Sequence, residues 1–294
     1  IAGVFEEVGS ELKSFLKDEK ISPKPLLICS GGTSSRCAAN DHWTLDLRKK
    51  YQQIQVDPIS NQVELGAGIT MGKLLKVLAK YGLSFPIGLS GTTGIGYLLT
   101  GGISPLSRSQ GLAIDQVINI RGCWGNGDAF EISKPTNSSS HEKKLIWRGL
   151  CGAAPFLGII TQLTVNSHKM IPLEVWETNI SPNQLAEVIQ KAESWPNSYS
   201  FQWTWGDVIK AYVVRRLDVA SNEGELEEIQ NTFPSSKPFL VSKVLGLQNI
   251  PDFNFSITKK QEVRRIHSEV LGLLGPAWGE DCVQLIQALH NLVT

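Results

Sequence analysis

Glycine is distributed unevenly along this chain of 294 residues, and this distribution constrains the fold more than any other feature of the sequence. Residues 1–172 contain 21 of the 27 glycines, whereas residues 173–294 contain 6. Glycine costs folding entropy in regular structure, so a fold retains it where the backbone turns sharply or approaches another group closely. Two stretches with such different backbone requirements predict two domains, at 1–172 and 173–294.

The first glycine-rich turn follows a short apolar strand at 26–29 and reads Ser-Gly-Gly-Thr-Ser-Ser over residues 30–35. Consecutive amides in such a turn can point toward one spot and bind an anion, most often phosphate. The three hydroxyl groups that follow the glycines, those of Thr33, Ser34 and Ser35, add further hydrogen-bond donors. Taken alone, this motif fits a tight solvent-facing turn equally well.

The second glycine-rich tract, residues 88–102, contains six glycines in 15 residues. A flexible linker is the alternative, but Ile95, Leu98 and Leu99 are interleaved with the glycines and linkers are polar. The tract is not a P-loop, because no Gly-Lys-Ser/Thr follows, and it does not match G-x-G-x-x-G between a strand and a helix. Two anion-binding loops together suggest a ligand with a diphosphate and a long flat body.

Apolar periodicity and turn residues predict the other elements. Helices are expected at 5–19, 70–81, 182–194, 225–232, 259–274 and 281–293, with Thr70 and Ser181 as N-caps. Strands are expected at 26–29, 43–47, 54–57, 62–67, 116–120, 129–132, 158–165, 174–180, 199–205 and 210–217, and a mobile loop at 135–144.

An unbroken alternation in the strand at 199–205 places four aromatic residues on one face: Tyr199, Phe201, Trp203 and Trp205. Packing against covering helices is the favoured interpretation, because aromatic side chains are usually buried. The alternative is an aromatic wall of a substrate pocket.

Composition excludes several classes of protein. The 28 basic and 28 acidic residues balance, so the chain lacks the basic field that non-specific nucleic-acid binding requires. No apolar run approaches the roughly 18 residues of a membrane span, and no signal-peptide pattern is present. The five cysteines form no C-x-x-C pair and the five histidines lack metal-ligand spacing, so no metal site is expected. Reduced thiols fit a cytoplasmic location.

Four segments, taken in order, resemble the FAD-linked oxidases of the vanillyl-alcohol oxidase family, and within it the berberine-bridge-enzyme-like branch. They are SGGTSS (30–35), VELGAGITMGKLLKVLAKYGLSFPIG (63–88), TTGIGYLLTGGISPLSRSQGLAIDQV (92–117) and LIWRGLCGAAPFLGIITQLTV (145–165). The resemblance covers roughly residues 5–170. It implies an α+β fold, in which a PCMH-type FAD-binding domain of two subdomains precedes a substrate domain made of an antiparallel sheet with helices.

The resemblance also implies FAD as the cofactor and suggests its contacts. The first loop would cradle the diphosphate, and the second would line the diphosphate and the isoalloxazine. The segment at the start of the last predicted strand of this half would contact the adenine end through its main chain. The implied cofactor-binding residues are Gly31, Gly32, Thr33, Ser34, Ser35, Ser90, Thr92, Thr93, Gly94, Gly96, Gly101, Gly102, Asp115, Gly158, Ile159 and Ile160.

Four positions depart from the family pattern. Thr33 stands where many members attach FAD through a histidine, and Ser90 stands where the bicovalent branch uses a cysteine. Neither side chain can form these linkages, so FAD is expected to be bound non-covalently. Tyr97 and Ile103 replace usual glycines, which leaves open a flavin-free binding or scaffold descendant of the fold.

The function implied by the resemblance is oxidation of an alcohol or a sugar-like small molecule. Hydride would pass to flavin N5, with O2 or another molecule as the electron acceptor. A flavin reductase that uses NAD(P)H is a further alternative. Relatives carry catalytic tyrosine or acid positions in a C-terminal segment that has no counterpart before Thr294, so no catalytic residue is assigned. The substrate domain is therefore expected to be compact or incomplete at its C-terminus.

Overall fold

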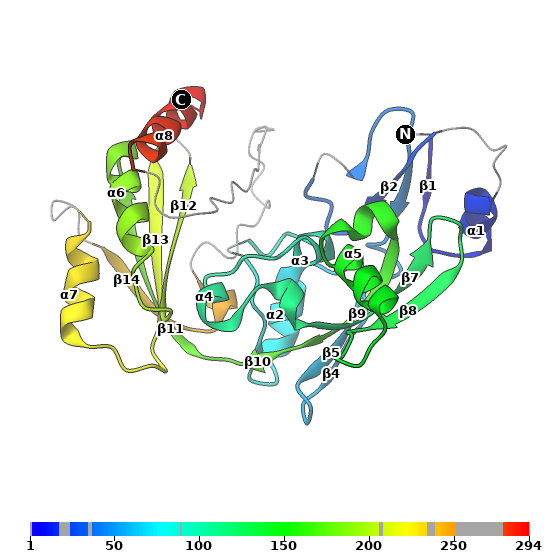
Figure 1. Ribbon diagram of the computed structural model, residues 1–294, viewed down its shortest axis with the longest axis horizontal. Helices are drawn as coiled ribbons and strands as arrows, with labels where there is room; N and C mark the ends of the chain where they lie inside the picture. Colours follow the sequence, from blue (N-terminus) through cyan, green and yellow to red (C-terminus); the bar gives the residue numbers. More distant parts are fainter. Residues whose placement is uncertain are drawn as a thin grey trace. The chain divides into compact units, whose positions relative to one another are not determined.

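The computed structural model describes residues 2–17, 24–34, 37–88, 90–205, 208–233, 239–250 and 279–293. The chain divides into two units (Figure 1). The first comprises Ile1–Met170 and Gly246–Phe255, and the second comprises Ile171–Leu245 and Ser256–Thr294. The chain therefore returns to the first unit after crossing part of the second.

A three-stranded parallel sheet opens the first unit, in the order β1-β3-β2. Its elements are β1 (Gly3–Phe5), α1 (Ser10–Lys17), β2 (Leu26–Cys29) and β3 (Trp43–Asp46). The helix expected at 5–19 begins later, and Phe5 lies in a strand instead. Phe5 stacks on Trp43 with ring centroids 5.1 Å apart and also contacts Phe15, so strand pairing and ring packing override the helical pattern there.

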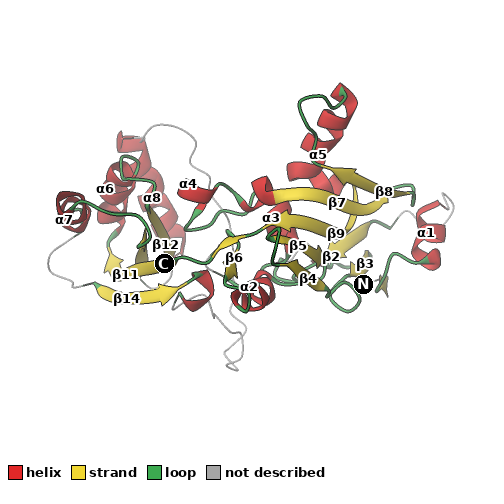
Figure 2. Cartoon of the chain, turned by 90° about the horizontal axis from the view of Figure 1, so that it is seen from below, coloured by secondary structure: helices red, strands yellow, loops and turns green. Residues whose placement is uncertain are grey.

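A five-stranded antiparallel sheet forms the second part of this unit, in the order β4-β5-β9-β7-β8 (Figure 2). Its strands are β4 (Ile54–Asp57), β5 (Gln62–Gly66), β7 (Val117–Trp124), β8 (Ala129–Ser133) and β9 (Gly158–Asn166). All five were predicted, although β7 extends further than expected. Leu65, Ile120 and Leu163 are fully buried and form part of the core of this sheet.

Helix α5 (His141–Leu157) packs beside β9 and was not predicted. Gly149 and Gly152 interrupt its apolar periodicity, and the helix is kinked at Cys151 and Gly152, where the backbone angles are not helical. The loop expected at 135–144 therefore ends at Ser140, whose side chain accepts a hydrogen bond from Lys143 N.

Helix α2 (Met71–Ala79) begins where its predicted N-cap places it, because Thr70 Oγ1 accepts a hydrogen bond from Lys73 N. After it, β6 (Leu83–Ser84) pairs with β10 (His168–Lys169). The second glycine-rich tract then forms a short helix, followed by two more turns of helix. These elements are α3 (Ile95–Leu99), α4 (Ser107–Gln110) and the 3₁₀ turn η2 (Ala113–Gln116).

The second unit contains a four-stranded antiparallel sheet in the order β12-β13-β11-β14. Its elements are β11 (Pro172–Ile180), α6 (Pro182–Ala192), β12 (Tyr199–Trp205), β13 (Ile209–Arg216), α7 (Glu223–Asn231), β14 (Leu240–Leu245) and α8 (Gly279–Val293), and η3 (Leu247–Asn249) belongs to the first unit. Strand β14 was not predicted, and the helix expected at 259–274 lies outside the described residues. Helices α6 and α8 lie side by side (Figure 1), joined by a 2.8 Å hydrogen bond from Gln287 Nε2 to Asn183 Oδ1.

The aromatic face of β12 packs into the core of the second unit. Tyr199 is buried with residues of α6, α7 and α8, and Phe201 and Trp203 pack against the same cluster. Phe201 stacks on Trp203 with ring centroids 5.5 Å apart. Packing against helices, the favoured sequence interpretation, is confirmed for these three residues.

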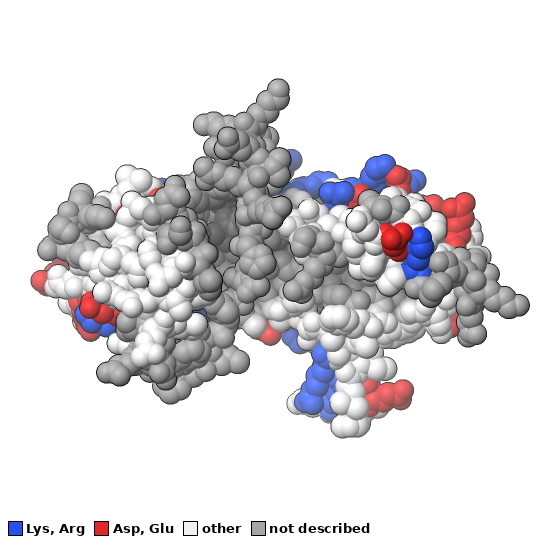
Figure 3. Space-filling model, turned by 90° about the horizontal axis from the view of Figure 1, so that it is seen from above, with Lys and Arg blue, Asp and Glu red and all other residues white. Residues whose placement is uncertain are grey.

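Charged side chains of both signs are interspersed on the face seen in Figure 3. Ion pairs such as Lys17–Asp128 (3.3 Å) and Lys50–Glu7 (3.9 Å) join exposed groups of the first unit. Among the described helices, none combines the length and apolar run needed to cross a bilayer. Within the same described residues, no three His, Cys, Asp or Glu side chains are grouped to hold a metal ion.

Candidate cofactor site

The first glycine-rich loop begins at the edge of the sheet where two parallel strands end. Cys29, the last residue of β2, is in register with Asp46, the last residue of β3. Leu47 N, just after β3, donates a 3.0 Å hydrogen bond to Cys29 O. The carboxyl ends of neighbouring parallel strands meet at one edge, which is where such folds commonly bind ligands. The loop after β2 therefore lies beside the residues that follow β3.

The main chain of this first loop carries unpaired hydrogen-bond donors. The N–H groups of Gly31, Gly32 and Thr33 donate to no residue that the structure describes, and Gly32 and Thr33 are exposed. Gly32 has φ +75°, a left-handed conformation that favours glycine. Ser34 continues the loop, whereas Ser35 lies outside the described residues. Successive free amides in such a turn fit an anionic group such as a diphosphate.

The two glycine-rich loops contact each other directly through their main chains. A Cβ atom at Gly31 would lie 2.3 Å from Gly94 N, and one at Gly94 would lie 2.2 Å from Gly31 N. Ser30 Oγ links the loops, since it donates to Ala67 O at 2.7 Å and accepts from Ile95 N at 3.1 Å. Contact between the loops thus requires glycine at both positions, independently of any ligand.

Hydroxyl groups of the second loop bond to one another. Ser90 Oγ and Thr92 Oγ1 are 2.7 Å apart, and Thr92 N donates to Ser90 Oγ at 3.3 Å. Thr93 Oγ1 donates to Ser90 O at 3.4 Å. These three predicted binding residues therefore brace the loop, and their contact with FAD stays a prediction.

The second loop also occupies the N-terminus of α2. Met71 N donates to Thr93 O and Gly72 N donates to Gly91 O, both at 2.8 Å. The first amides of a helix have no partner within the helix and often bind anions. Here the loop carbonyls satisfy them, so the anion-binding donors of this region are those of the first loop.

A cation lies against the first loop. Arg48 follows β3, and a Cβ atom at Gly32 would lie 2.5 Å from Arg48 Nη1. Asp46 holds the guanidinium, because Nε donates to Oδ1 at 2.9 Å and Nη2 donates to Oδ2 at 2.7 Å. These hydrogen bonds from Arg48 hold the pKa of the Asp46 carboxyl below its ordinary value of 3.8, so the pair is charged at neutral pH. Sequence reasoning missed Arg48, because a basic residue after a strand is typical of a solvated turn.

Two of the departures from the family pattern contact each other. Tyr97 Oη donates a 2.5 Å hydrogen bond to Ile103 O. The same oxygen would lie 2.9 Å from a Cβ atom at Gly88. Burial raises the pKa of the Tyr97 hydroxyl. The ring therefore occupies space beside Gly88 that a glycine at position 97 would leave open.

The last glycines of the tract pair with the turn that follows. Gly101 O accepts from Ile114 N and Gly102 O accepts from Ala113 N, both at 3.0 Å. Asp115 Oδ2 caps the same turn by accepting from Leu112 N at 2.9 Å. The structure thus brings Gly101, Gly102 and Asp115 together in a structural arrangement, and their role toward FAD stays a prediction.

The third predicted segment lies at the start of β9. Ile159 and Ile160 are buried, and Gly158 N donates to Ala154 O. A Cβ atom at Gly158 would lie 2.8 Å from Cys123 O, so the neighbouring strand β7 requires glycine there. Main-chain contact with FAD at these three positions likewise stays a prediction.

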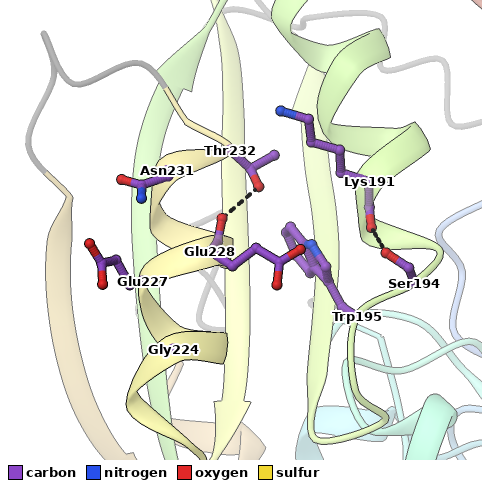
Figure 4. Close-up of a pocket in the computed structure, with 8 residues that line it drawn as sticks. All are labelled: Lys191, Ser194, Trp195, Gly224, Glu227, Glu228, Asn231 and Thr232. Atoms are coloured by element: carbon purple, nitrogen blue, oxygen red, sulfur yellow. Dashed lines mark hydrogen bonds between the residues drawn. The ribbon is translucent and has the colours of Figure 1, made fainter.

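A separate hollow of about 530 Å³ lies in the second unit between α6 and α7 (Figure 4). Its lining residues are Lys191, Ser194, Trp195, Gly224, Glu227, Glu228, Asn231 and Thr232. Two carboxylates oppose one ammonium group in this lining, a charge balance that disfavours a diphosphate.

Comparison with known proteins identifies the domain that contains the two loops. Residues 9–133 match the family described as an FAD binding domain, and this stretch contains the whole first loop, Arg48 and the second loop. These residues form an FAD-binding domain. An FAD-linked oxidoreductase of Dictyostelium discoideum is 41% identical over 118 residues, which are 40% of this chain and 25% of that protein.

Solved structures share the fold of this FAD-binding domain and of the sheet that follows it. Xylooligosaccharide oxidase from Myceliophthora thermophila, solved with xylobiose, matches with a TM-score of 0.70 and 16% identity over 88% of this chain and 56% of that one. Berberine bridge enzyme matches with a TM-score of 0.61 and 16% identity over 81% of this chain and 51% of that one. The predicted α+β class and PCMH-type fold are confirmed.

The chain is shorter than the proteins that it matches. The matched stretch is 25% to 33% of the length of the first three curated relatives. Activity, substrate and partners, which belong to those whole proteins, are therefore matters of proposal for this chain.

Proposed function

We propose that this chain is an FAD-dependent oxidoreductase that holds FAD without a covalent bond and oxidises an alcohol or a sugar-like substrate. The observation that carries the proposal is the run of main-chain N–H groups at Gly31, Gly32 and Thr33, which donate to no described residue and lie within an FAD-binding domain. Main-chain donors of this kind bind phosphate without requiring a charged side chain in the loop itself. The first loop would accordingly hold the diphosphate of FAD.

Two hydroxyl side chains support the non-covalent part of the proposal. Thr33 occupies the position where the family's histidine linkage would form, and Ser90 occupies that of the cysteine linkage. Ser90 Oγ is moreover engaged with Thr92 Oγ1 at 2.7 Å. Neither residue supplies an imidazole nitrogen or a thiol, so affinity for FAD would come from hydrogen bonds and packing alone.

The substrate class rests on the relatives. Bound FAD would supply the two-electron chemistry by accepting a hydride at flavin N5 from a substrate carbon. The residues of this chain would bind and orient the nucleotide. The xylooligosaccharide oxidase of similar fold was solved with xylobiose, which favours an alcohol or sugar hydroxyl as the group oxidised here.

Reconstitution with FAD followed by acid precipitation tests both parts of the proposal. We expect the reconstituted protein to show the visible absorption bands of flavin, and acid to release all of the colour into the supernatant. A colourless protein after reconstitution would overturn the assignment of FAD. Flavin that stays in the pellet would overturn the non-covalent assignment alone.

A flavin-free binding protein is the second candidate, and the Tyr97–Ile103 hydrogen bond favours it. In this case the ring of Tyr97 would replace part of the ligand instead of lying beside it. We expect the Tyr97→Gly variant to bind FAD even if the wild-type chain does not. Bleaching of the bound flavin by NADPH under anaerobic conditions, with none by alcohols or sugars, would instead identify a reductase.

A further inference from the structure

We propose that Arg48 binds the diphosphate of FAD directly and that Asp46 is the positioning residue that orients it. The inference deepens the proposed function and rests on it, because it names a side chain that acts together with the amides of the first loop. Neither residue belongs to the glycine-rich motifs. Asp46 is the last residue of β3, and Arg48 follows it by two residues.

The guanidinium of Arg48 lies beside the first loop. β2 and β3 are parallel and end in register, so Arg48 projects from the same sheet edge as the loop at Gly31–Thr33. Arg48 Nη1 would lie 2.5 Å from a Cβ at Gly32, so the guanidinium lies directly beside the backbone of the loop. A group bound by the amides of this loop would therefore meet the guanidinium as well.

The guanidinium of Arg48 is held in one orientation by Asp46. An arginine has five N–H donors in a rigid plane. Asp46 accepts from Nε and Nη2, whereas Nη1 has no hydrogen-bond partner among the described residues. The Asp46 carboxylate thus fixes the plane of the guanidinium and leaves the Nη1 donors, which lie against the loop, free for a phosphate oxygen. Arginine suits this task because its fork matches the geometry of phosphate oxygens.

The two lysines that follow Arg48 in the sequence form ion pairs with glutamates near the N-terminus. Lys49 pairs with Glu6 and Lys50 pairs with Glu7, so the next two basic residues are engaged elsewhere on the surface. The Arg48 side chain keeps 48% of its surface exposed despite its ion pair, which leaves it accessible to a ligand. Arg48 is the residue whose side chain lies beside Gly32.

Equilibrium titration of the FAD-free protein with FAD tests the proposal, with quenching of flavin fluorescence as the readout. We expect Arg48→Ala and the bulkier Arg48→Gln to raise the Kd for FAD roughly 10- to 100-fold, the usual range for a hydrogen bond to a charged group. The wild-type Kd should rise with NaCl concentration more steeply than that of either variant, because one screened attraction has been removed. Riboflavin, which has no diphosphate, should bind all three proteins equally.

Two control variants remove a positive charge, as the Arg48 variants do, but from other positions in the chain. Lys49→Ala removes one positive charge from the adjacent position, and Arg216→Ala removes an arginine held by Asp218 in the same two-bond fork (3.0 and 2.7 Å) in the second unit. Both should bind FAD like the wild type. Equal FAD affinity in the wild type and the Arg48 variants, or equal losses for FAD and riboflavin, would overturn the role of Arg48 while leaving the proposed function intact. A wild-type chain that binds no FAD would overturn both.

Discussion

At the scale of single residues, glycine has two distinct roles in the candidate site. Gly31 and Gly94 allow two loops to touch, since a Cβ at either position would overlap the other loop's backbone. Gly96 has open space, with nothing within 4 Å of the corresponding Cβ position. The sequence alone predicts that glycines cluster for close approach, but it does not reveal whether a ligand or another loop makes the approach.

Alanine substitution separates these two roles. Gly94→Ala should lower the free energy of unfolding by about 1–3 kcal/mol, because the backbone of Gly31 cannot move away easily. Gly96→Ala, the matched control within helix α3, should leave it unchanged or raise it by up to about 1 kcal/mol. Urea denaturation of the FAD-free proteins measures both. Equal stability of the two variants would contradict the contact between the loops.

Cysteine reactivity gives a second test at this scale. Burial, with a smaller contribution from the neighbouring Cys37, raises the pKa of the Cys29 thiol to about 11. At pH 8 only about one Cys29 in a thousand would then be a reactive thiolate. Iodoacetamide should therefore label the half-buried Cys37 well before Cys29 in the native protein, as read by peptide mass spectrometry. Equal labelling rates would show that Cys29 at the end of β2 is accessible and ionised.

At the scale of elements, regular periodicity predicted most of the fold. Local sequence patterns predicted three features that the packing also favours. These are the strands of the five-stranded sheet, the Thr70 cap of α2 and the aromatic face of β12. Helix α5 was missed because its glycines interrupt the apolar periodicity of a helix. The helix forms nevertheless, since it packs beside β9. Arg48 was missed for a related reason: which loop a side chain contacts depends on the register of β2 with β3, and one sequence does not show this register.

The ion pair at the end of β3 should make stability depend on pH. Arg48 holds the folded-state pKa of Asp46 below 3.8, so the unfolded chain takes up this proton more readily than the folded protein. The contribution of the pair is therefore complete above about pH 4–5 and is lost as the pH falls through the folded-state pKa.

Comparison with Asp46→Asn measures this contribution. At pH 7 the variant should be less stable by about 1 kcal/mol or less, since the arginine is half exposed. The difference in the free energy of unfolding should shrink between about pH 5 and pH 3, as the wild-type carboxylate becomes protonated. A difference that stays constant over this range would show that the carboxylate charge does not contribute.

At the scale of the whole molecule, two units share the chain, and the first unit carries both loops of the candidate site. The prediction of two domains divided after residue 172 stays a prediction, as does the division of labour between them. The account depends most on one claim, namely that the free amides of the first loop hold the diphosphate of FAD.

Amide chemical shifts measured during an FAD titration test this claim most directly. In the ¹⁵N-labelled protein, the resonances of Gly31, Gly32 and Thr33 should move on addition of FAD and saturate with the Kd obtained from flavin fluorescence. Riboflavin should leave these three resonances where they are. Saturable binding of FAD with no change at the three amides would contradict the account.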